Sequence, residues 1–203
     1  MSSEPTVFVV DDDTIARQAM VKLLGAIFAR VEGYASASEF LAAYDREQPG
    51  CLVAEVVLPG MSGLELHRRL SAARDGQPAL PVIFVTRHAS VPIAVEAMQA
   101  GAVHFLEKPA REQDIWNSVR KALDIDRENR DRAARRAQME KRLATLSHGE
   151  REVLDRILTG KFNKQIASEL SLSIRTIEDR RARVMKKLEV TSLVELVQGM
   201  LNR

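Results

Sequence analysis

Five short apolar runs, each followed by a segment with helical spacing, constrain the fold of the first half of this 203-residue chain. Between the runs, apolar residues recur at helical intervals, as they do from Ile15 to Ile27. Strands that alternate with helices in this way form a parallel sheet with helices on both faces. The pattern predicts a five-stranded, doubly wound α/β domain that binds ligands beyond the carboxyl ends of its strands. The predicted strands are Thr6–Val10, Val31–Ala35, Cys51–Val57, Pro81–Thr86 and Ala102–Glu107.

The second half of the chain has a purely helical pattern. The stretch from Arg111 to Leu143 lacks proline and glycine and is crowded with charges. We predict that the last helix of the first domain continues through it as a helical linker; the alternative is a flexible charged tether. The expected organisation is a domain over 1–123, a linker over 124–143 and a smaller all-α domain over 144–203. Its four helices are predicted at 148–159, 163–170, 174–188 and 193–202.

The two halves of the chain also differ in charge. Residues 1–109 hold 13 acidic and 9 basic side chains, whereas residues 110–203 hold 15 acidic and 21 basic ones. The excess is concentrated in 161–187, which contains eight basic and three acidic residues. A basic second half beside an acidic first half predicts a polyanionic partner for the second domain.

Composition excludes several classes of protein. A single cysteine, Cys51, cannot form an internal disulfide, which fits a reducing cytoplasm. The chain has no apolar stretch long enough to span a membrane, and residues 1–6 do not begin a signal peptide. An aromatic content of 4% argues against single-strand binding by base stacking. We therefore expect a cytoplasmic protein without a membrane partner.

Five polar residues follow the predicted strands of the first domain. Asp11 and Asp12 come after the first strand, Glu55 lies near the end of the third, Thr86 ends the fourth and Lys108 follows the fifth. These side chains should converge on one rim of the sheet. The three carboxylates suit a hard cation such as Mg²⁺, and a lysine and a hydroxyl beside them suit a phosphoryl group.

The motifs around these residues resemble those of response-regulator receiver domains, which have a flavodoxin-like fold. They are Val9–Asp13, Leu58–Gly63, Val85–Thr86 and Phe105–Pro109, and the likeness extends over residues 6–123. The resemblance implies that the acid pair Asp11 and Asp12 binds Mg²⁺. It further implies that Thr86 and Lys108 contact the phosphoryl group, that Phe105 is a rotating switch aromatic, and that position 55 accepts phosphate from a histidine kinase.

The acceptor position departs from this pattern, because it is occupied by Glu55 where the family has aspartate. The extra methylene moves the carboxylate outward, toward the place of a phosphoryl oxygen. One charge then substitutes for the roughly −1.5 to −2 of a phosphate. We predict that ordinary aspartyl phosphorylation is lost, which leaves a standing active-like state or a receiver that does not signal. Whether Glu55 remains a metal ligand, and whether a kinase acts on the protein, stay open.

Residues 163–188 have the pattern of a helix-turn-helix. Two short predicted helices are joined by a tight turn, and the second buries Ile177, Val184 and Leu188 on one face. Leu146–Leu154, Asn163–Ala167 and Arg175–Glu178 resemble the LuxR-type DNA-binding domain, over residues 144–203. The whole chain therefore resembles a FixJ/NarL-type response regulator. That resemblance implies that the 174–188 helix enters the major groove of double-stranded DNA and that the protein acts as a homodimer.

The candidate DNA contacts differ in their expected roles. Phosphate contacts are expected from Lys164, Arg180, Arg181 and Lys187, although Arg181 lies near the buried stripe and is an alternative brace of the fold. Thr176 lies on the same face as Arg183, which is placed to reach a guanine edge. Asp179 either accepts from a cytosine amino group or forms a solvated pair with Arg183.

The expected function is that of a DNA-binding transcription regulator rather than an enzyme. Two alternatives remain, namely a conventional phosphorelay output regulator and a receiver that acts mainly as a protein-interaction module. A third, weaker one is a haloacid-dehalogenase-type phosphatase, because Asp11-x-Asp13-Thr14 resembles its nucleophile motif. That chemistry requires a second acidic cluster late in the chain, which the sequence lacks.

Overall fold

The computed structural model describes residues 4–72 and 78–201, with the backbone alone at Leu201. The predicted helix ends at Ala73 and Asn202 lie outside the described residues. By internal contacts the chain forms two compact units, which divide between Asp131 and Arg132. The elements of the first unit are β1 (Thr6–Val10), α1 (Thr14–Gly25), β2 (Val31–Tyr34), α2 (Ala37–Ala43), β3 (Gly50–Ala54), α3 (Gly63–Ser71), β4 (Val82–Thr86), α4 (Val91–Gln99), β5 (His104–Glu107) and the first part of α5 (Glu112–Ala144).

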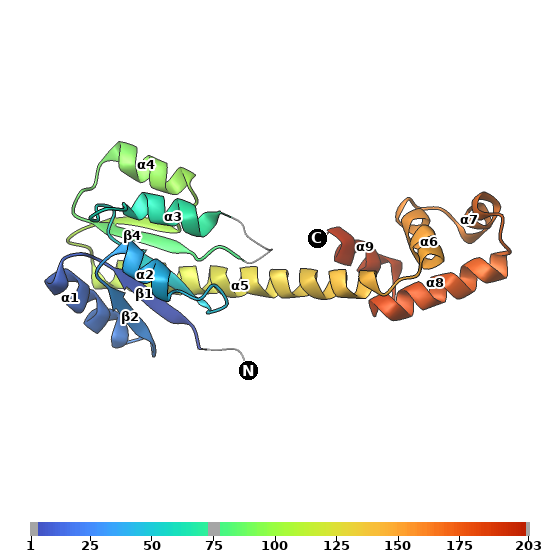
Figure 1. Ribbon diagram of the computed structural model, residues 1–203, viewed down its shortest axis with the longest axis horizontal. Coiled ribbons are helices and arrows are strands. Elements are labelled where there is room, and N and C mark those ends of the chain that lie inside the picture. Colours follow the sequence, from blue (N-terminus) through green and yellow to red (C-terminus); the bar gives the residue numbers. More distant parts are fainter. Residues whose placement is uncertain (1–3, 73–77, 202–203) are drawn as a thin grey trace. The chain divides into compact units, whose positions relative to one another are not determined.

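The predicted doubly wound sheet is confirmed. All five strands are parallel and lie in the order β2-β1-β3-β4-β5 (Figure 1). Alternate residues of β1 enter two different cores, as the two-residue period of a strand requires. Phe8 and Val10 pack with residues of α2, α3 and α4, whereas Val7 and Val9 pack with residues of α1 and α5. Helices therefore cover both faces, and the carboxyl ends of the strands are left as one polar rim.

Helix α5 is a single helix of 33 residues, as predicted for the segment without proline or glycine. Its first turns pack into the core of the first unit through Ile115 and Val119, and its last turns into the core of the second through Met139 and Leu143. The division between the two units thus falls inside the predicted linker 124–143, whose ends contribute to different units.

A buried ion pair fastens α5 to the sheet of the first unit. Asp126, which is 2% exposed, accepts hydrogen bonds from the main-chain N–H of Gly50 and from Nε of Arg130, both at 2.9 Å. The Arg130 guanidinium also donates to the carbonyl oxygens of Arg46, Glu47 and Gln48. Burial raises the pKa of Asp126, and the hydrogen bonds from Gly50 and Arg130 oppose that rise. The beginning of the predicted linker is therefore bound to the first unit.

The second unit contains the helices predicted for a small all-α domain. They are α6 (His148–Leu158), α7 (Asn163–Leu170), α8 (Ile174–Leu188) and α9 (Leu193–Leu201). Ser147 and Glu150 form a capping box at the start of α6, and Ser173 caps α8 through the N–H of Thr176. Ser171 ends α7 in the left-handed conformation, which turns the chain tightly toward α8. Ile177, Val184 and Leu188 are fully buried, as the apolar stripe predicts.

Candidate signalling pocket and DNA-binding face

The polar residues predicted at the sheet rim do lie together in the structure. Asp11 and Glu55 are buried, with side chains 7% and 5% exposed, and Thr86 is completely buried. Asp11 directly follows β1, Glu55 directly follows β3, Thr86 is the last residue of β4, and Lys108 directly follows β5. Parallel strands bring their carboxyl ends to one edge, so the topology alone gathers residues that are far apart in sequence.

Both carboxylate oxygens of Glu55 are occupied by donors from the rim. The Thr86 hydroxyl and the main-chain N–H of Val56 donate to Oε1, the latter at 2.9 Å. Oε2 accepts from Lys108 Nζ at 3.0 Å and from the main-chain N–H of Arg87 at 3.4 Å. Glu55 thus contacts both the hydroxyl and the ammonium group that the receiver pattern assigns to a phosphoryl group.

Electrostatics favour the charged form of Glu55. Burial raises the pKa of this carboxyl, but the hydrogen bond from Thr86 and the hydrogen bond and charge of Lys108 outweigh burial. The pKa of Glu55 therefore lies below its usual range, and the side chain is an anion at neutral pH. A negative charge therefore occupies this position at neutral pH.

Lys108 connects two of the three acids. Its Nζ lies 2.6 Å from Asp11 Oδ2 as well as 3.0 Å from Glu55 Oε2. Asp12 is exposed, and its carboxylate makes no contact with these groups. Within the described residues, no group of three or more His, Cys, Asp or Glu side chains is arranged to hold a metal ion. Because an ammonium group lies where a divalent cation would share these carboxylates, the residues as arranged do not fit Mg²⁺.

Two contacts hold the loop after β4 beside the polar rim of the sheet. The main-chain N–H of His88 donates to Thr86 Oγ1 at 3.0 Å, and the Arg87 guanidinium pairs with Asp13. That ion pair is the main reason why the pKa of Asp13 is lowered to about 2. Phe105, the predicted switch aromatic, is half-buried beside Phe84, with ring centroids 6.3 Å apart.

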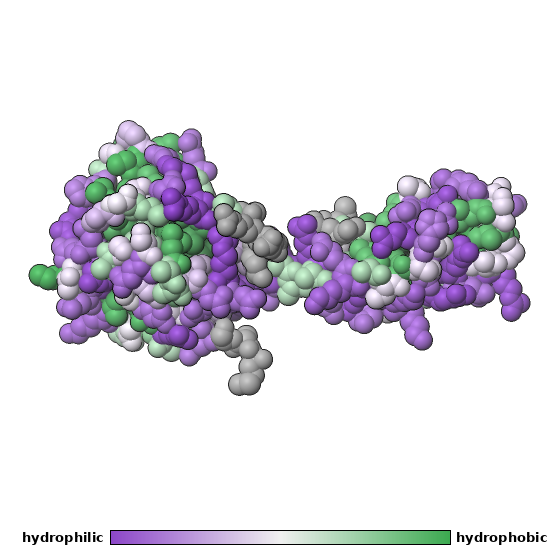
Figure 2. Space-filling model, viewed as in Figure 1, coloured by the Kyte–Doolittle hydropathy of each residue, from purple (hydrophilic) through white to green (hydrophobic). Residues whose placement is uncertain are grey.

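In the second unit, α8 presents a charged outer face opposite its buried stripe, and Figure 2 shows hydrophilic side chains over this helix. Asp179 and Arg183 are exposed on that face, and the predicted pair between them is not formed, although both residues are described. Lys164 is exposed near the start of α7. Thr176 is half-buried, and its hydroxyl is hydrogen-bonded to that of Ser173.

The other three predicted phosphate contacts are bound within the fold. Lys187 Nζ lies 2.6 Å from Glu150 Oε2 and donates to the carbonyl of Thr145. Arg181 donates to the Asn163 side chain at 3.1 Å, as expected if it braces the fold. The Arg180 guanidinium lies across Gly149, where an added Cβ would come within 2.6 Å of it.

Two basic residues on the outer face of α8 were not among the DNA contacts predicted from the sequence. Arg175 and Lys186 are exposed, and neither forms an ion pair within the described residues. Arg175, Ala182 and Lys186 have the same i, i+7, i+11 spacing as the buried stripe, and each lies two residues before a member of that stripe. Two residues correspond to a little more than half a helical turn, so these three lie on the opposite face. That offset was readable from the sequence, and it identifies the middle of the exposed face.

A receiver-type signalling domain followed by a helix-turn-helix DNA-binding domain is the class of protein that this fold and these sites define. Comparison with known families agrees: residues 7–120 match the response regulator receiver domain, and residues 144–200 match the luxR family of bacterial regulatory proteins. The chain belongs to the LuxR-family, FixJ/NarL-type response regulators of two-component systems. These are DNA-binding transcription regulators and not enzymes, so the phosphatase alternative is excluded.

Similarity to individual proteins extends along nearly the whole chain. The transcriptional regulatory protein FixJ of Azorhizobium caulinodans is 43% identical over 192 residues, which are 95% of this chain and 90% of that protein. The response regulator protein TodT of Pseudomonas putida is 36% identical over 95% of this chain and 83% of its own length. Among solved structures, the response regulator StyR is 40% identical and superposes with a TM-score of 0.83, over 99% of this chain and 100% of that one.

Proposed function

We propose that this response regulator is held in an active-like state by Glu55 and is not switched by ordinary aspartyl phosphorylation. The observation that carries the proposal is the simultaneous contact of Glu55 with Thr86 and Lys108. These are the groups that would otherwise contact a phosphoryl oxygen. The carboxylate supplies about half or more of the charge of a phosphate, in a position that the extra methylene lets it reach.

Glu55→Asp tests the role of the longer side chain. The shorter carboxylate withdraws from Thr86 and Lys108, so we expect DNA affinity to fall about tenfold to a hundredfold, as follows from loss of about one hydrogen bond to a charged group. Acetyl phosphate should then restore binding in this variant alone, because aspartate is the usual acceptor. Affinity is measured by fluorescence anisotropy with a labelled duplex that carries a site recovered by selection from a random library.

Glu107→Asp is the matched control, since Glu107 is exposed at the end of β5 and makes no contact with the pocket. It should bind DNA as the wild type does. Unchanged affinity in Glu55→Asp would refute a standing active-like state.

Phosphoryl transfer to the wild-type chain, followed by tighter DNA binding, would instead support the conventional phosphorelay alternative, which the retained Asp11 and Lys108 favour.

We further propose that α8 enters the major groove and that two subunits bind paired half-sites as a cytoplasmic homodimer. Exposed basic side chains on α7 and α8 supply the phosphate contacts, and Asp179 is placed to accept from a cytosine amino group. Val91 and Val95, which are 78% and 47% exposed on α4, offer an apolar stripe for self-association. No helix in the described part of the chain is both long and apolar enough to cross a membrane.

DNA binding should depend steeply on salt. Neutralisation of about five phosphates per subunit predicts a slope of about −4 to −5 per subunit when the logarithm of the binding constant is plotted against that of the salt concentration. The slope is measured with a duplex recovered by selection from a random library. A scrambled duplex of equal length serves as the control for sequence preference. A flat salt response would contradict DNA binding by this basic face.

A further inference from the structure

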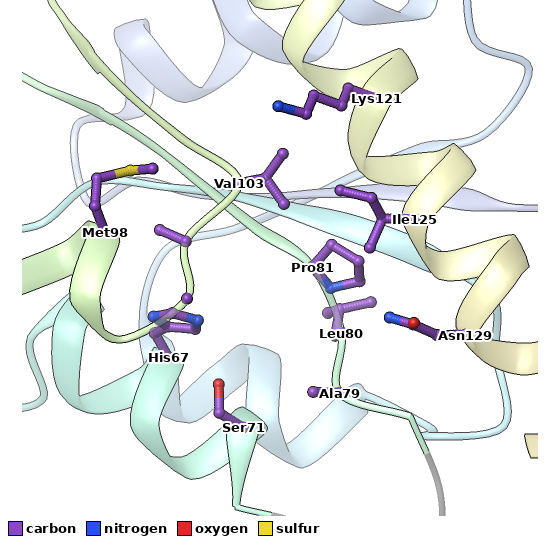
Figure 3. Close-up of a pocket in the computed structure, with 12 residues that line it drawn as sticks. His67, Ser71, Ala79, Leu80, Pro81, Met98, Val103, Lys121, Ile125 and Asn129 are labelled. Carbon is purple, nitrogen blue, oxygen red and sulfur yellow. The ribbon is translucent and has the colours of Figure 1, made fainter. Parts of the chain in front are cut away.

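A second pocket lies at the opposite edge of the sheet from Glu55. Its volume is about 360 Å³, and it opens beside the start of β4 and the turn before β5 (Figure 3). Its apolar walls come from separate elements and include Leu80, Pro81, Met98, Val103 and Ile125. Cavities of this size and mixed lining are typical of sites for small molecules.

One buried polar group in this pocket lacks a partner. His67, on α3, is 3% exposed, its ring packs edge-on against Phe84, and its Nδ1 makes no hydrogen bond with the described residues. A buried polar atom without a partner costs free energy, so such groups in folded proteins usually have an explanation. Nδ1 of His67 therefore adds unused hydrogen-bonding capacity to the lining of the pocket.

Other polar side chains at the pocket are also available. Lys121 and Asn129, both on α5, border it on the side away from His67 (Figure 3). Neither side chain forms a hydrogen bond or an ion pair with the described residues, and the same holds for the Ser71 hydroxyl. Polar groups with unused hydrogen-bonding capacity thus surround an apolar floor.

The charge of the pocket selects the kind of ligand. Lys121 is a cation, and no carboxylate occurs among the described residues that line the pocket. Burial, and secondarily the charge of Arg68, lowers the pKa of His67, so its imidazole is neutral at pH 7 and both donates and accepts hydrogen bonds. An anionic head beside Lys121 with an apolar body against Ile125 and Val103 matches this distribution.

We propose that this pocket binds a small organic carboxylate with an apolar body. Lys121 pairs with the carboxylate, and the apolar walls enclose the rest of the molecule. Lys121, Ile125 and Asn129 repeat every four residues and therefore form one stripe on α5. The ligand thus contacts the helix whose last turns belong to the core of the DNA-binding unit. The site does not depend on the state of Glu55.

The test uses 4-fluorobenzoate as the probe and the full-length protein, with fluorine NMR to measure the dissociation constant. Lys121→Met keeps the length of the side chain and removes its charge from an exposed position. We expect it to raise the dissociation constant about threefold to tenfold, the effect of one charge-assisted contact near the surface. Lys22→Met is the matched control, because Lys22 is an exposed helical lysine on α1 that lines no part of this pocket.

Two further measurements separate a specific site from weak surface binding. Ser71→Phe fills the cavity from an exposed position, so it should abolish binding while leaving the thermal unfolding midpoint close to that of the wild type. The wild type should bind the neutral analogue 4-fluorobenzamide more weakly than 4-fluorobenzoate. Lys121→Met should bind the two compounds with equal affinity, because it lacks the charge that distinguishes them. Absence of saturable binding by the wild type, or equal affinity for 4-fluorobenzoate in the wild type and both pocket variants, would overturn the proposal.

Discussion

We expect Lys108→Met to lower the free energy of unfolding of the first unit by about 3 to 5 kcal/mol, which is the usual cost of removing one partner from a buried ion pair. The Lys108 side chain is 17% exposed and lies between the carboxylates of Asp11 and Glu55, which are 7% and 5% exposed. Methionine leaves two buried anions close together without a cation. Unfolding in urea is followed by the fluorescence of Trp116, which lies on α5 and packs against the core of the first unit.

Two controls separate the loss of charge compensation from other effects of the substitution. Lys22→Met replaces an exposed lysine that has no ion-pair partner in the described part of the chain, and it should change stability by less than about 0.5 kcal/mol. The double variant Lys108→Met, Glu55→Gln should recover part of the loss, because one of the two uncompensated charges is gone. A loss below about 1 kcal/mol in Lys108→Met, or no recovery in the double variant, would show that the ion pair contributes little.

The same contact has a predictable pH dependence. In the wild type, the pKa of Glu55 in the folded chain lies below its value of 4.5 in the unfolded chain. A depressed pKa contributes stability that is present above pH 4.5 and is lost as the pH falls through the folded-state value. In Lys108→Met, the ammonium group that lowers the pKa of Glu55 is absent, so burial should raise this pKa above its wild-type value. The difference in stability between the wild type and Lys108→Met should therefore shrink on acidification below pH 4.5.

The signals that predicted the fold were local. Short apolar runs specify the five strands, and the Ser147–Glu150 capping box specifies where α6 begins. The topology then brought Asp11, Glu55, Thr86 and Lys108 to one edge, so the membership of the pocket followed from the strand assignments. Family motifs added the roles of these residues, which spacing alone does not supply.

Contacts between distant segments were not readable in the same way. Asp126 and Arg130 belong to a dense run of charges that is typical of a solvated helix, yet both pack against the loop before β3. Lys187 lies on a basic helix face that predicts a phosphate contact, yet the capping carboxylate of Glu150 lies close enough to bind it. In each case the partner comes from another element, and its distance depends on tertiary packing.

The double variant Arg175→Ala, Lys186→Ala should lower DNA affinity about tenfold to a hundredfold. Both side chains are exposed on the outer face of α8, and neither forms a hydrogen bond or an ion pair with another described residue. Removal of two phosphate contacts per subunit should also reduce the magnitude of the salt slope by about 2 per subunit, since each such contact contributes about one unit. Because the fold does not use these side chains, the thermal unfolding midpoint should stay within a degree or two of the wild type.

Lys187→Met makes the comparison decisive, because it removes a basic residue from the same helix. Glu150 is 4% exposed and loses its ammonium partner in this variant, so the second unit should unfold more easily, while the salt slope of DNA binding stays as in the wild type. The two variants thus separate charges that bind DNA from charges that hold the fold. If Lys187→Met reduces the salt slope and Arg175→Ala, Lys186→Ala does not, the helix faces DNA with a different side, and the outer-face assignment is wrong.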